Sequence, residues 1–315
     1  MRAQLVGAAI LSLAATPAFG QTLHLEAQLD SPVPIRNATT CERGARVVGI
    51  GEDGAIYAWN LPSGPARKIS IPNGLVRKVA CAGDNTLAVG LRGGTLLLLD
   101  AESGNVRRRI ETKDVVQTIA LSPDGSLLAF ATLLTPTQLW DTRTGQRLSV
   151  SGTSMGASYA VAFSPDGNVF VSADQDTRLR AYDRKGKLLY AVDGGLLEPF
   201  AVAFTADGKQ FAVAGAEGAV FLYDTVSGKK LKSSVNSGRA IFALTMSPDS
   251  KSVAALELDI FSLAPASIGL WDMQSSALKT LAVDPKSVLG AGPGKSHLLL
   301  VRKDSAKTLT VSSVQ

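Results

Sequence analysis

The sequence is built from a unit that recurs every 40 to 48 residues. An apolar stretch followed by Ser-Pro-Asp-Gly or a close variant occurs at 119–125, 159–167, 202–208 and 244–250. Each copy continues into an alternating apolar run that ends in an aromatic–Asp pair, and two weaker copies end in Leu-Asp and Trp-Asn. The six unit ends are Trp59, Leu99, Trp140, Tyr182, Tyr223 and Trp271. Period-2 alternation between turn signals indicates short β-strands rather than helices.

A period of this length with strand alternation predicts an all-β propeller of four-stranded antiparallel blades. Length alone suggests about two domains. However, a blade buries its faces only against neighbouring blades, so we expect one closed domain over residues 21–315. The composition, 45% hydrophobic and 19% charged, supplies a large core and argues against disorder.

The two ends of the chain complete the blade count. Residues 287–315 offer three strands, whereas a blade needs four. Residues 22–30 alternate strictly, with Leu23, Leu25, Ala27 and Leu29 on one side, and form one isolated strand. Pairing of this N-terminal strand with the C-terminal blade would close the ring and remove an exposed sheet edge. We therefore predict seven blades.

Residues 1–20 have the pattern of a secretory signal peptide. Arg2 is followed by an apolar core from Leu5 to Ala15, and Ala18-Phe19-Gly20 fits a cleavage site before Gln21. The apolar run is shorter than the roughly twenty residues that span a bilayer. We expect cleavage between Gly20 and Gln21, a periplasmic or secreted mature protein, and no membrane span in it.

The Ser-Pro-Asp-Gly turns and terminal Trp-Asp pairs resemble those of WD-repeat β-propellers, in particular the looser, secreted bacterial type. The resemblance covers about residues 22–315. The Gly-His pair that opens many such repeats is missing, since the histidines are His24 and His297. The resemblance implies a rigid scaffold whose face loops bind proteins or peptides. A purely structural role is expected for the turn residues, because Pro, Asp and Gly suit successive corners of a tight turn. These residues are Pro123, Asp124, Pro165, Asp166 and Gly167.

Basic residues recur after each aromatic–Asp pair, in the segment expected to form the outermost strand of a blade. Charge there protects a free sheet edge from pairing with another molecule. The net charge of +5 is thereby spread around the rim, whereas a nucleic-acid-binding protein would gather it into one stripe with aromatic residues. We expect no nucleic-acid partner.

Cys41 and Cys81 stand in equivalent places, each 18 residues before the end of its unit. Two interpretations remain open. They are either small buried apolar residues, or a disulfide between adjacent blades, which an oxidising compartment would permit. Their spacing and the absence of a companion His do not suggest a metal site.

The turn between the second and third strands is long and apolar in two blades. It holds Leu133 and Leu134 in one and Ile260, Phe261 and Leu263 in the other. Such side chains either contact a partner or fold back over the ring. Asp176 and Arg178 occupy the corresponding turn of the unit that ends in Tyr182. Asp174 and Asp176 suggest a cation site, but turn capping is the simpler role of Asp176, and Arg178 and Arg180 would neutralise both carboxylates.

No catalytic constellation, metal site or cofactor motif emerges from the sequence. Gly290–Gly294 lacks the Lys-Ser/Thr end of a phosphate loop, and no Gly-x-Ser-x-Gly elbow with a partner His appears. We therefore expect an exported, non-catalytic, monomeric scaffold that binds an envelope or secreted protein. The alternative is an exported propeller enzyme, such as a lactonase-like hydrolase or a quinoprotein-like dehydrogenase.

Overall fold

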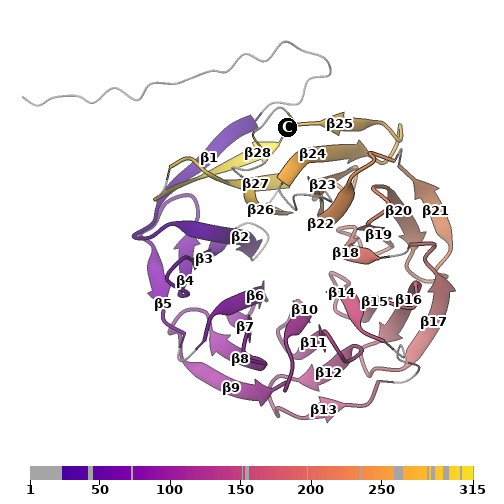
Figure 1. Cartoon of the computed structure of the whole chain (residues 1–315), viewed down its shortest axis with the longest axis horizontal. Helices are drawn as coiled ribbons and strands as arrows, with labels where there is room; N and C mark the ends of the chain where they lie inside the picture. Colours follow the sequence, from indigo (N-terminus) through magenta and orange to yellow (C-terminus); the bar gives the residue numbers. More distant parts are fainter. Residues whose placement is uncertain are drawn as a thin grey trace, which may run out of the picture.

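Seven four-stranded antiparallel sheets stand around a central axis (Figure 1). This computed structural model describes residues 23–41, 45–71, 74–150, 152, 156–196, 198–234, 236–258, 265–281, 284, 288–293, 298–305 and 307–314. Six sheets are built from consecutive strands, and the seventh joins the two ends of the chain. The predicted all-β, seven-bladed propeller is confirmed. The expected signal peptide, with its cleavage site at Gly20 and Gln21, lies outside the described residues.

Each blade runs from an inner strand near the axis to an outer strand at the rim. Blade one comprises β2 (Ile35–Cys41), β3 (Arg46–Gly51), β4 (Ile56–Asn60) and β5 (Arg67–Ile69). Blade two comprises β6 (Val76–Cys81), β7 (Thr86–Leu91), β8 (Thr95–Asp100) and β9 (Val106–Glu111). Blade three comprises β10 (Val116–Leu121), β11 (Leu127–Thr132), β12 (Gln138–Asp141) and β13 (Arg147–Leu148).

The next three blades repeat this order. Blade four comprises β14 (Ser158–Phe163), β15 (Val169–Asp174), β16 (Arg178–Asp183) and β17 (Leu188–Asp193). Blade five comprises β18 (Pro199–Phe204), β19 (Gln210–Gly215), β20 (Val220–Asp224) and β21 (Lys230–Ser233). Blade six comprises β22 (Ala240–Met246), β23 (Ser252–Leu258), β24 (Pro265–Asp272) and β25 (Leu278–Thr280).

Blade seven is closed by the N-terminal strand. From the axis outward it comprises β26 (Val288–Pro293), β27 (Leu298–Lys303) and β28 (Thr308–Val314), and β1 (Leu23–Asp30) pairs with β28 as the outermost strand. The predicted strict alternation of β1 is wrong at Leu25. The register shifts between Leu25 and Ala27, so Leu25 is 64% exposed whereas Ala27 and Leu29 are buried.

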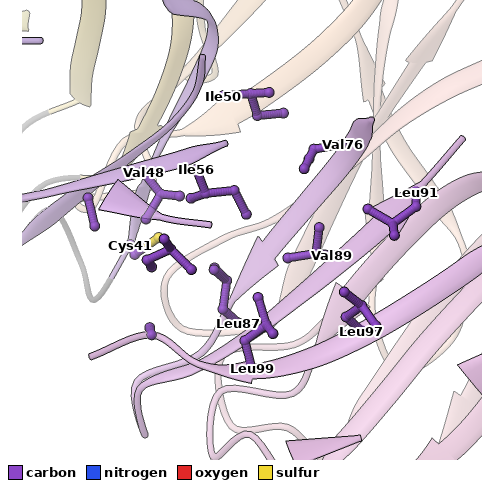
Figure 2. Packing of buried hydrophobic residues seen from close by; sticks show 13 residues of the cluster. Cys41, Val48, Ile50, Ile56, Val76, Leu87, Val89, Leu91, Leu97 and Leu99 are labelled. Atoms are coloured by element: carbon purple, nitrogen blue, oxygen red, sulfur yellow. The ribbon is translucent and has the colours of Figure 1, made fainter. Parts of the chain in front are cut away.

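The hydrophobic core lies between neighbouring blades. Because side chains of a strand alternate between its two faces, Val47 packs toward blade seven and the adjacent Val48 packs toward blade two. Figure 2 shows the layer between blades one and two, where Val48 and Ile56 meet Leu87, Val89 and Leu99. A single blade could not bury both of its apolar faces, so the blades stabilise one another around the ring.

The Ser-Pro-Asp-Gly segments form the tight turns between first and second strands. Gly125, Gly167 and Gly208 have φ of 69°, 70° and 70°. The carboxylate of Asp166 accepts the N–H of Asn168 at 3.1 Å and the hydroxyl of Ser164 at 2.5 Å. These motifs therefore form the tight turns that the sequence predicts.

Part of the extra length of blade six lies in two extended strands. The sequence assigned the excess between Leu256 and Leu270 to an insertion between strands. Instead, β23 extends to Leu258 and β24 begins at Pro265, and the two strands pair over the added length. Ile260, Phe261 and Leu263 lie outside the described residues. Within the described part of the chain, no helix is long and apolar enough to cross a membrane.

Candidate functional site

One face of the propeller carries the first residues of every inner strand and the turns between second and third strands. The pairing of Ile35 with Gly51, and of Val116 with Thr132, places the start of an inner strand beside the end of the second strand. The turn that follows the second strand therefore lies on the same face. We call this the bulge face, because of the feature described next.

Every inner strand contains a β-bulge near its first residue. In β2 the register shifts between Ile35 and Asn37, and the equivalent shift occurs in the six other inner strands. A bulge leaves one residue without a cross-strand partner and redirects its side chain. Six of the seven bulged residues form what we call the bulge ring: Arg36, Arg77, Gln117, Tyr159, Phe200 and Phe242.

Blades one to three contribute the polar part of the bulge ring. Arg36 and Arg77 are exposed. Arg36 donates to the backbone carbonyl of Val76, and Arg77 donates to the Gln117 side-chain oxygen at 3.3 Å. Each hydrogen bond joins one blade to the next. Lys78 adds a third exposed cation, and its pKa is lowered by desolvation between the inner strands and by repulsion from Arg77.

These three cations have no acidic partner within the described part of the chain. The ion pairs found there involve other basic residues. An arginine carries five N–H donors, and the single side-chain hydrogen bonds of Arg36 and Arg77 leave donors for a further acceptor. The polar part of the bulge ring therefore presents uncompensated positive charge near the ring axis.

Blades four to six contribute the aromatic part. The rings of Tyr159 and Phe200 meet edge to face, with centroids 5.9 Å apart. Phe200 and Phe242 are stacked at 4.3 Å with an interplanar angle of 9°. All three side chains remain partly exposed. Burial raises the pKa of the Tyr159 hydroxyl, with a smaller contribution from Glu198. These rings form a continuous apolar arc opposite the arginines.

The long turn of blade three is exposed on the bulge face. Leu133 is 46% exposed and Leu134 is 80% exposed, so these two side chains do not fold back over the ring. The backbone is nevertheless held in place. The N–H of Leu133 donates to the Val115 carbonyl at 3.0 Å, and that of Leu134 donates to the Asp114 carboxylate at 2.8 Å. A fixed backbone that presents apolar side chains is pre-organised for contact with a partner.

In blade four, Asp176 and Arg178 are both exposed, but the Asp176 carboxylate is engaged by neighbouring groups of the same blade. Asp176 accepts the N–H of Arg178 at 3.3 Å and forms an ion pair with Arg180 at 2.5 Å. The Arg180 hydrogen bond lowers the pKa of Asp176. The capping role expected from the sequence is thus present, and the expected neutralisation of the carboxylates comes from Arg180.

A buried polar network continues from Arg180 into the preceding blade. Arg180 also pairs with Asp174 at 2.7 Å, and Asp174 accepts the Ser158 hydroxyl at 2.5 Å. Ser158 in turn accepts the Thr137 hydroxyl at 2.9 Å, from the long turn of blade three. Burial raises the pKa of Asp174, and its hydrogen bonds oppose this shift. The network ties blade three to blade four where no His-containing network is available.

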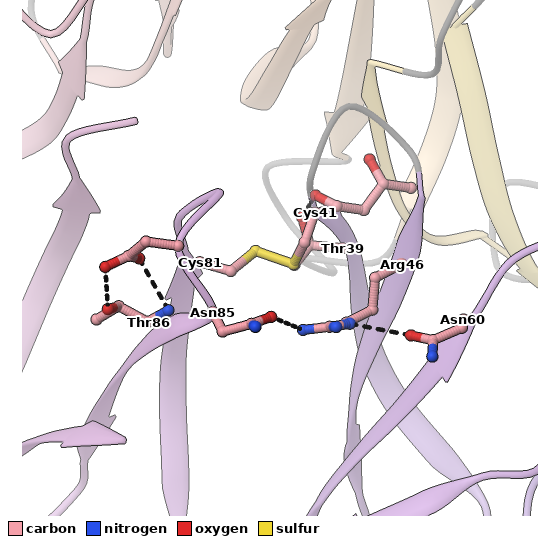
Figure 3. The surroundings of a disulfide bond; sticks show 9 residues. Thr39, Cys41, Arg46, Asn60, Cys81, Asn85 and Thr86 are labelled. Carbon is pink, nitrogen blue, oxygen red and sulfur yellow. Dashed lines mark hydrogen bonds between the residues drawn. A yellow bond between two sulfur atoms is a disulfide. The ribbon is translucent and has the colours of Figure 1, made fainter. Parts of the chain in front are cut away.

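Cys41 and Cys81 form a disulfide on the opposite face (Figure 3). They end the inner strands of blades one and two, with Cα atoms 5.9 Å apart. Arg46 reinforces the junction by donating to Asn85 at 3.0 Å and to Asn60 at 3.1 Å. Of the two interpretations left open by the sequence, the structure therefore has the bridge.

The bulge ring was not predicted from the sequence. Its members share no residue type, and a bulge leaves no local motif in these apolar strands. The available signal was positional, since each lies one or two residues after the first residue of an inner strand. Over the described residues, no group of three or more His, Cys, Asp or Glu side chains is arranged to hold a metal ion.

Comparison with known proteins supports the repeat. The family model "WD domain, G-beta repeat" matches residues 147–183, which run from the outer strand β13 through β16. "WD repeat and SOCS box-containing protein 1" of Xenopus tropicalis is 25% identical over 205 residues, covering 56% of this chain and 48% of that protein. "Meiotic recombination protein rec14" of Schizosaccharomyces pombe is 27% identical over 112 residues, covering 35% of this chain and 37% of that protein. The matches thus span less than half of either relative.

The seven four-stranded blades make this chain a β-propeller, and the WD-domain model identifies one of its repeats, over residues 147–183, as a WD40 repeat. WD40 propellers are typically scaffolds for protein interaction and are usually non-catalytic.

Proposed function

We propose that this protein is an exported, non-catalytic scaffold of the looser bacterial WD-repeat type, which binds a protein or peptide partner in the periplasm or cell envelope. The bulge face is the observation that carries the proposal. It combines exposed leucines on a fixed turn with cations that lack an acidic partner among the described residues. Exposed apolar groups beside polar ones are typical of protein-binding surfaces.

Export has two independent supports. The first twenty residues have the pattern of a secretory signal peptide. The Cys41–Cys81 disulfide suits an oxidising compartment, because cytosolic thiols are kept reduced. Cell fractionation followed by N-terminal sequencing tests this part, and we expect the mature chain to begin at Gln21. A cytosolic protein that retains Met1 would contradict it.

The binding role is tested by crosslinking in the native cell envelope, followed by native mass spectrometry. The double variant Leu133→Asp with Leu134→Asp should lose the crosslinked partner while keeping its melting temperature. Val226→Asp is the matched control, because Val226 is 86% exposed but lies in a turn on the opposite face. Equal loss in both variants would exclude a specific role for the bulge face. A protein without a partner that hydrolyses lactones would favour the enzyme alternative.

A further inference from the structure

We infer that the bulge ring binds a short extended segment of a partner protein that carries one acidic and one aromatic side chain, held by opposite halves of the ring. The inference rests on the proposed function and specifies its ligand. It follows from the division of the ring into a cationic part in blades one and two and an aromatic part in blades four to six.

The cationic part selects a carboxylate. Arg36 and Arg77 are exposed, each keeps N–H donors after its single side-chain hydrogen bond, and Lys78 adds a third positive charge beside them. Arginine forms paired, charge-assisted hydrogen bonds with a carboxylate. The contacts of Arg36 with Val76 and of Arg77 with Gln117 restrict both side chains before the ligand arrives. Less side-chain entropy is therefore lost on binding.

The aromatic part selects a flat apolar group. Tyr159, Phe200 and Phe242 touch in sequence and each remains partly exposed. Aromatic side chains bind another ring in offset-stacked or edge-to-face geometry. Phe200 sits at the centre of the arc and contacts both neighbours, so it anchors the platform.

A protein segment fits this surface better than a nucleic acid does. A single strand of nucleic acid is held by a basic groove that follows many phosphates. Here the cations occupy one part of a closed ring. On the same face, Leu75, Leu133 and Leu134 are 49%, 46% and 80% exposed, and they would meet apolar side chains flanking the bound segment.

The test uses fluorescein-labelled synthetic peptides with one Glu and one Trp in a Gly-Ser background. The two side chains are set about two to six residues apart, a reach of roughly 7 to 20 Å in an extended chain. Fluorescence anisotropy with the full mature protein should find at least one spacing that binds. Replacing the peptide Glu by Gln should weaken binding about tenfold, as expected for loss of a charge-assisted contact.

A double-mutant cycle tests which peptide side chain each half of the bulge ring binds. Arg77→Gln should weaken binding of the Glu peptide about tenfold but leave the Gln peptide unchanged, because the two changes remove the same contact. Phe200→Leu should likewise weaken binding of the peptide that carries Trp and leave binding of a peptide without this Trp unchanged. Arg92→Gln is the control for charge, since Arg92 is exposed in a turn of the same face. Phe204→Leu is the control for the aromatic half, since Phe204 lies at the other end of β18.

Three results of the binding experiments would overturn the inference. They are failure of every spacing to bind, equal effects from the ring and control variants, or tighter binding of oligothymidine that Phe200→Leu abolishes. A melting curve for each variant separates loss of binding from loss of the fold. If the crosslinked partner depends on Leu133 and Leu134 but not on Arg77 or Phe200, the inference fails and the proposed function stands. If it depends on neither pair, both fail.

Discussion

At the scale of single residues, the turns between first and second strands depend on a backbone conformation that glycine adopts without strain. Gly125 and Gly208 have nearly the same φ, 69° and 70°. Their surroundings differ. A Cβ at Gly125 would overlap the Asp84 carboxylate of the preceding blade, whereas one at Gly208 would only touch Pro165 at 3.4 Å.

This difference predicts unequal costs for the same substitution. Gly208→Ala should lower the free energy of unfolding by about 1 kcal/mol, the strain of a left-handed alanine. Gly125→Ala should cost more, because Asp84 must also move and weaken its hydrogen bonds with Thr86. Urea denaturation of the two variants measures both costs. Equal losses would mean that Asp84 moves freely.

The aspartates of the turns make stability sensitive to acid. The backbone N–H of Ser103 is the largest contributor to the low pKa of Asp100, which falls from 3.8 to about 2. A depressed pKa in the folded state means that the unfolded chain binds protons first. The stabilisation is therefore complete above pH 4 and is lost between about pH 4 and pH 2. Asp174, whose pKa is raised by burial, acts in the opposite direction.

We accordingly expect the free energy of unfolding to fall as the pH is lowered from 4 to 2. Asp100→Asn should flatten this dependence, because the variant lacks the titrating carboxylate. Urea titrations at several pH values measure the slope in both proteins. A slope that is unchanged by the substitution would assign the acid sensitivity to other turn aspartates, such as Asp166 and Asp207.

At the scale of strands and blades, the outer strands do more than protect a sheet edge. Arg108 of β9 donates to the backbone carbonyl of Arg143 at 2.7 Å, in the turn between the third and fourth strands of the next blade. Tyr190 of β17 and Lys232 of β21 make the equivalent contacts with Thr225 and Met273, at 2.8 and 2.9 Å. Charge at the rim, which the sequence explains as edge protection, thus also links neighbouring blades.

The disulfide is the covalent counterpart of these links. It closes a loop with a sequence separation of 40 residues, and such a loop restricts the unfolded chain by about 4 kcal/mol in a chain-entropy estimate. We expect the double variant Cys41→Ser with Cys81→Ser to lose a few kcal/mol in urea denaturation. Reduction of the wild type should reproduce most of this loss. A variant as stable as the oxidised protein would show that the bridge does not contribute.

At the scale of the whole molecule, ring closure depends on β1. Leu29 is 1% exposed and packs with Ala27, Val301, Leu309 and Val311. The Trp59 indole donates to the Asp30 carbonyl at 2.8 Å, which fastens the closing strand to blade one. Because the blades stabilise one another only as a closed ring, weakness at this junction is transmitted to all seven.

Two leucines of the same strand therefore make a matched pair. Leu29→Ala should lower the free energy of unfolding by about 2–5 kcal/mol, the usual cost of a buried Leu-to-Ala change. Leu25→Ala should have almost no effect, because Leu25 is 64% exposed. Thermal and urea denaturation of both variants measure the difference. Deletion of residues 22–30 should destabilise the whole domain, and an unchanged transition would rule out closure by β1.

The sequence by itself determined the number of blades, their strands, the closing strand and the conformation of the turns. These features depend on alternation and turn residues, which can be recognised within one repeat, and on a fixed period, which can be recognised by comparing repeats along the chain. The pairing of Cys41 with Cys81 remained open because it depends on the distance between two blades. The exposure of Leu133 and Leu134 remained open because it depends on how their turn packs against the rest of the ring.

Only the tertiary structure decided the bulge ring. Arg36, Gln117 and Phe242 share no motif, and each looks like an ordinary strand residue in its own repeat. Register shifts remove them from cross-strand pairing, and closure of the ring brings seven such positions around one axis. Their grouping into a cationic and an aromatic part follows from the order of the blades in space. This is why a pattern read along one strand does not contain the candidate site.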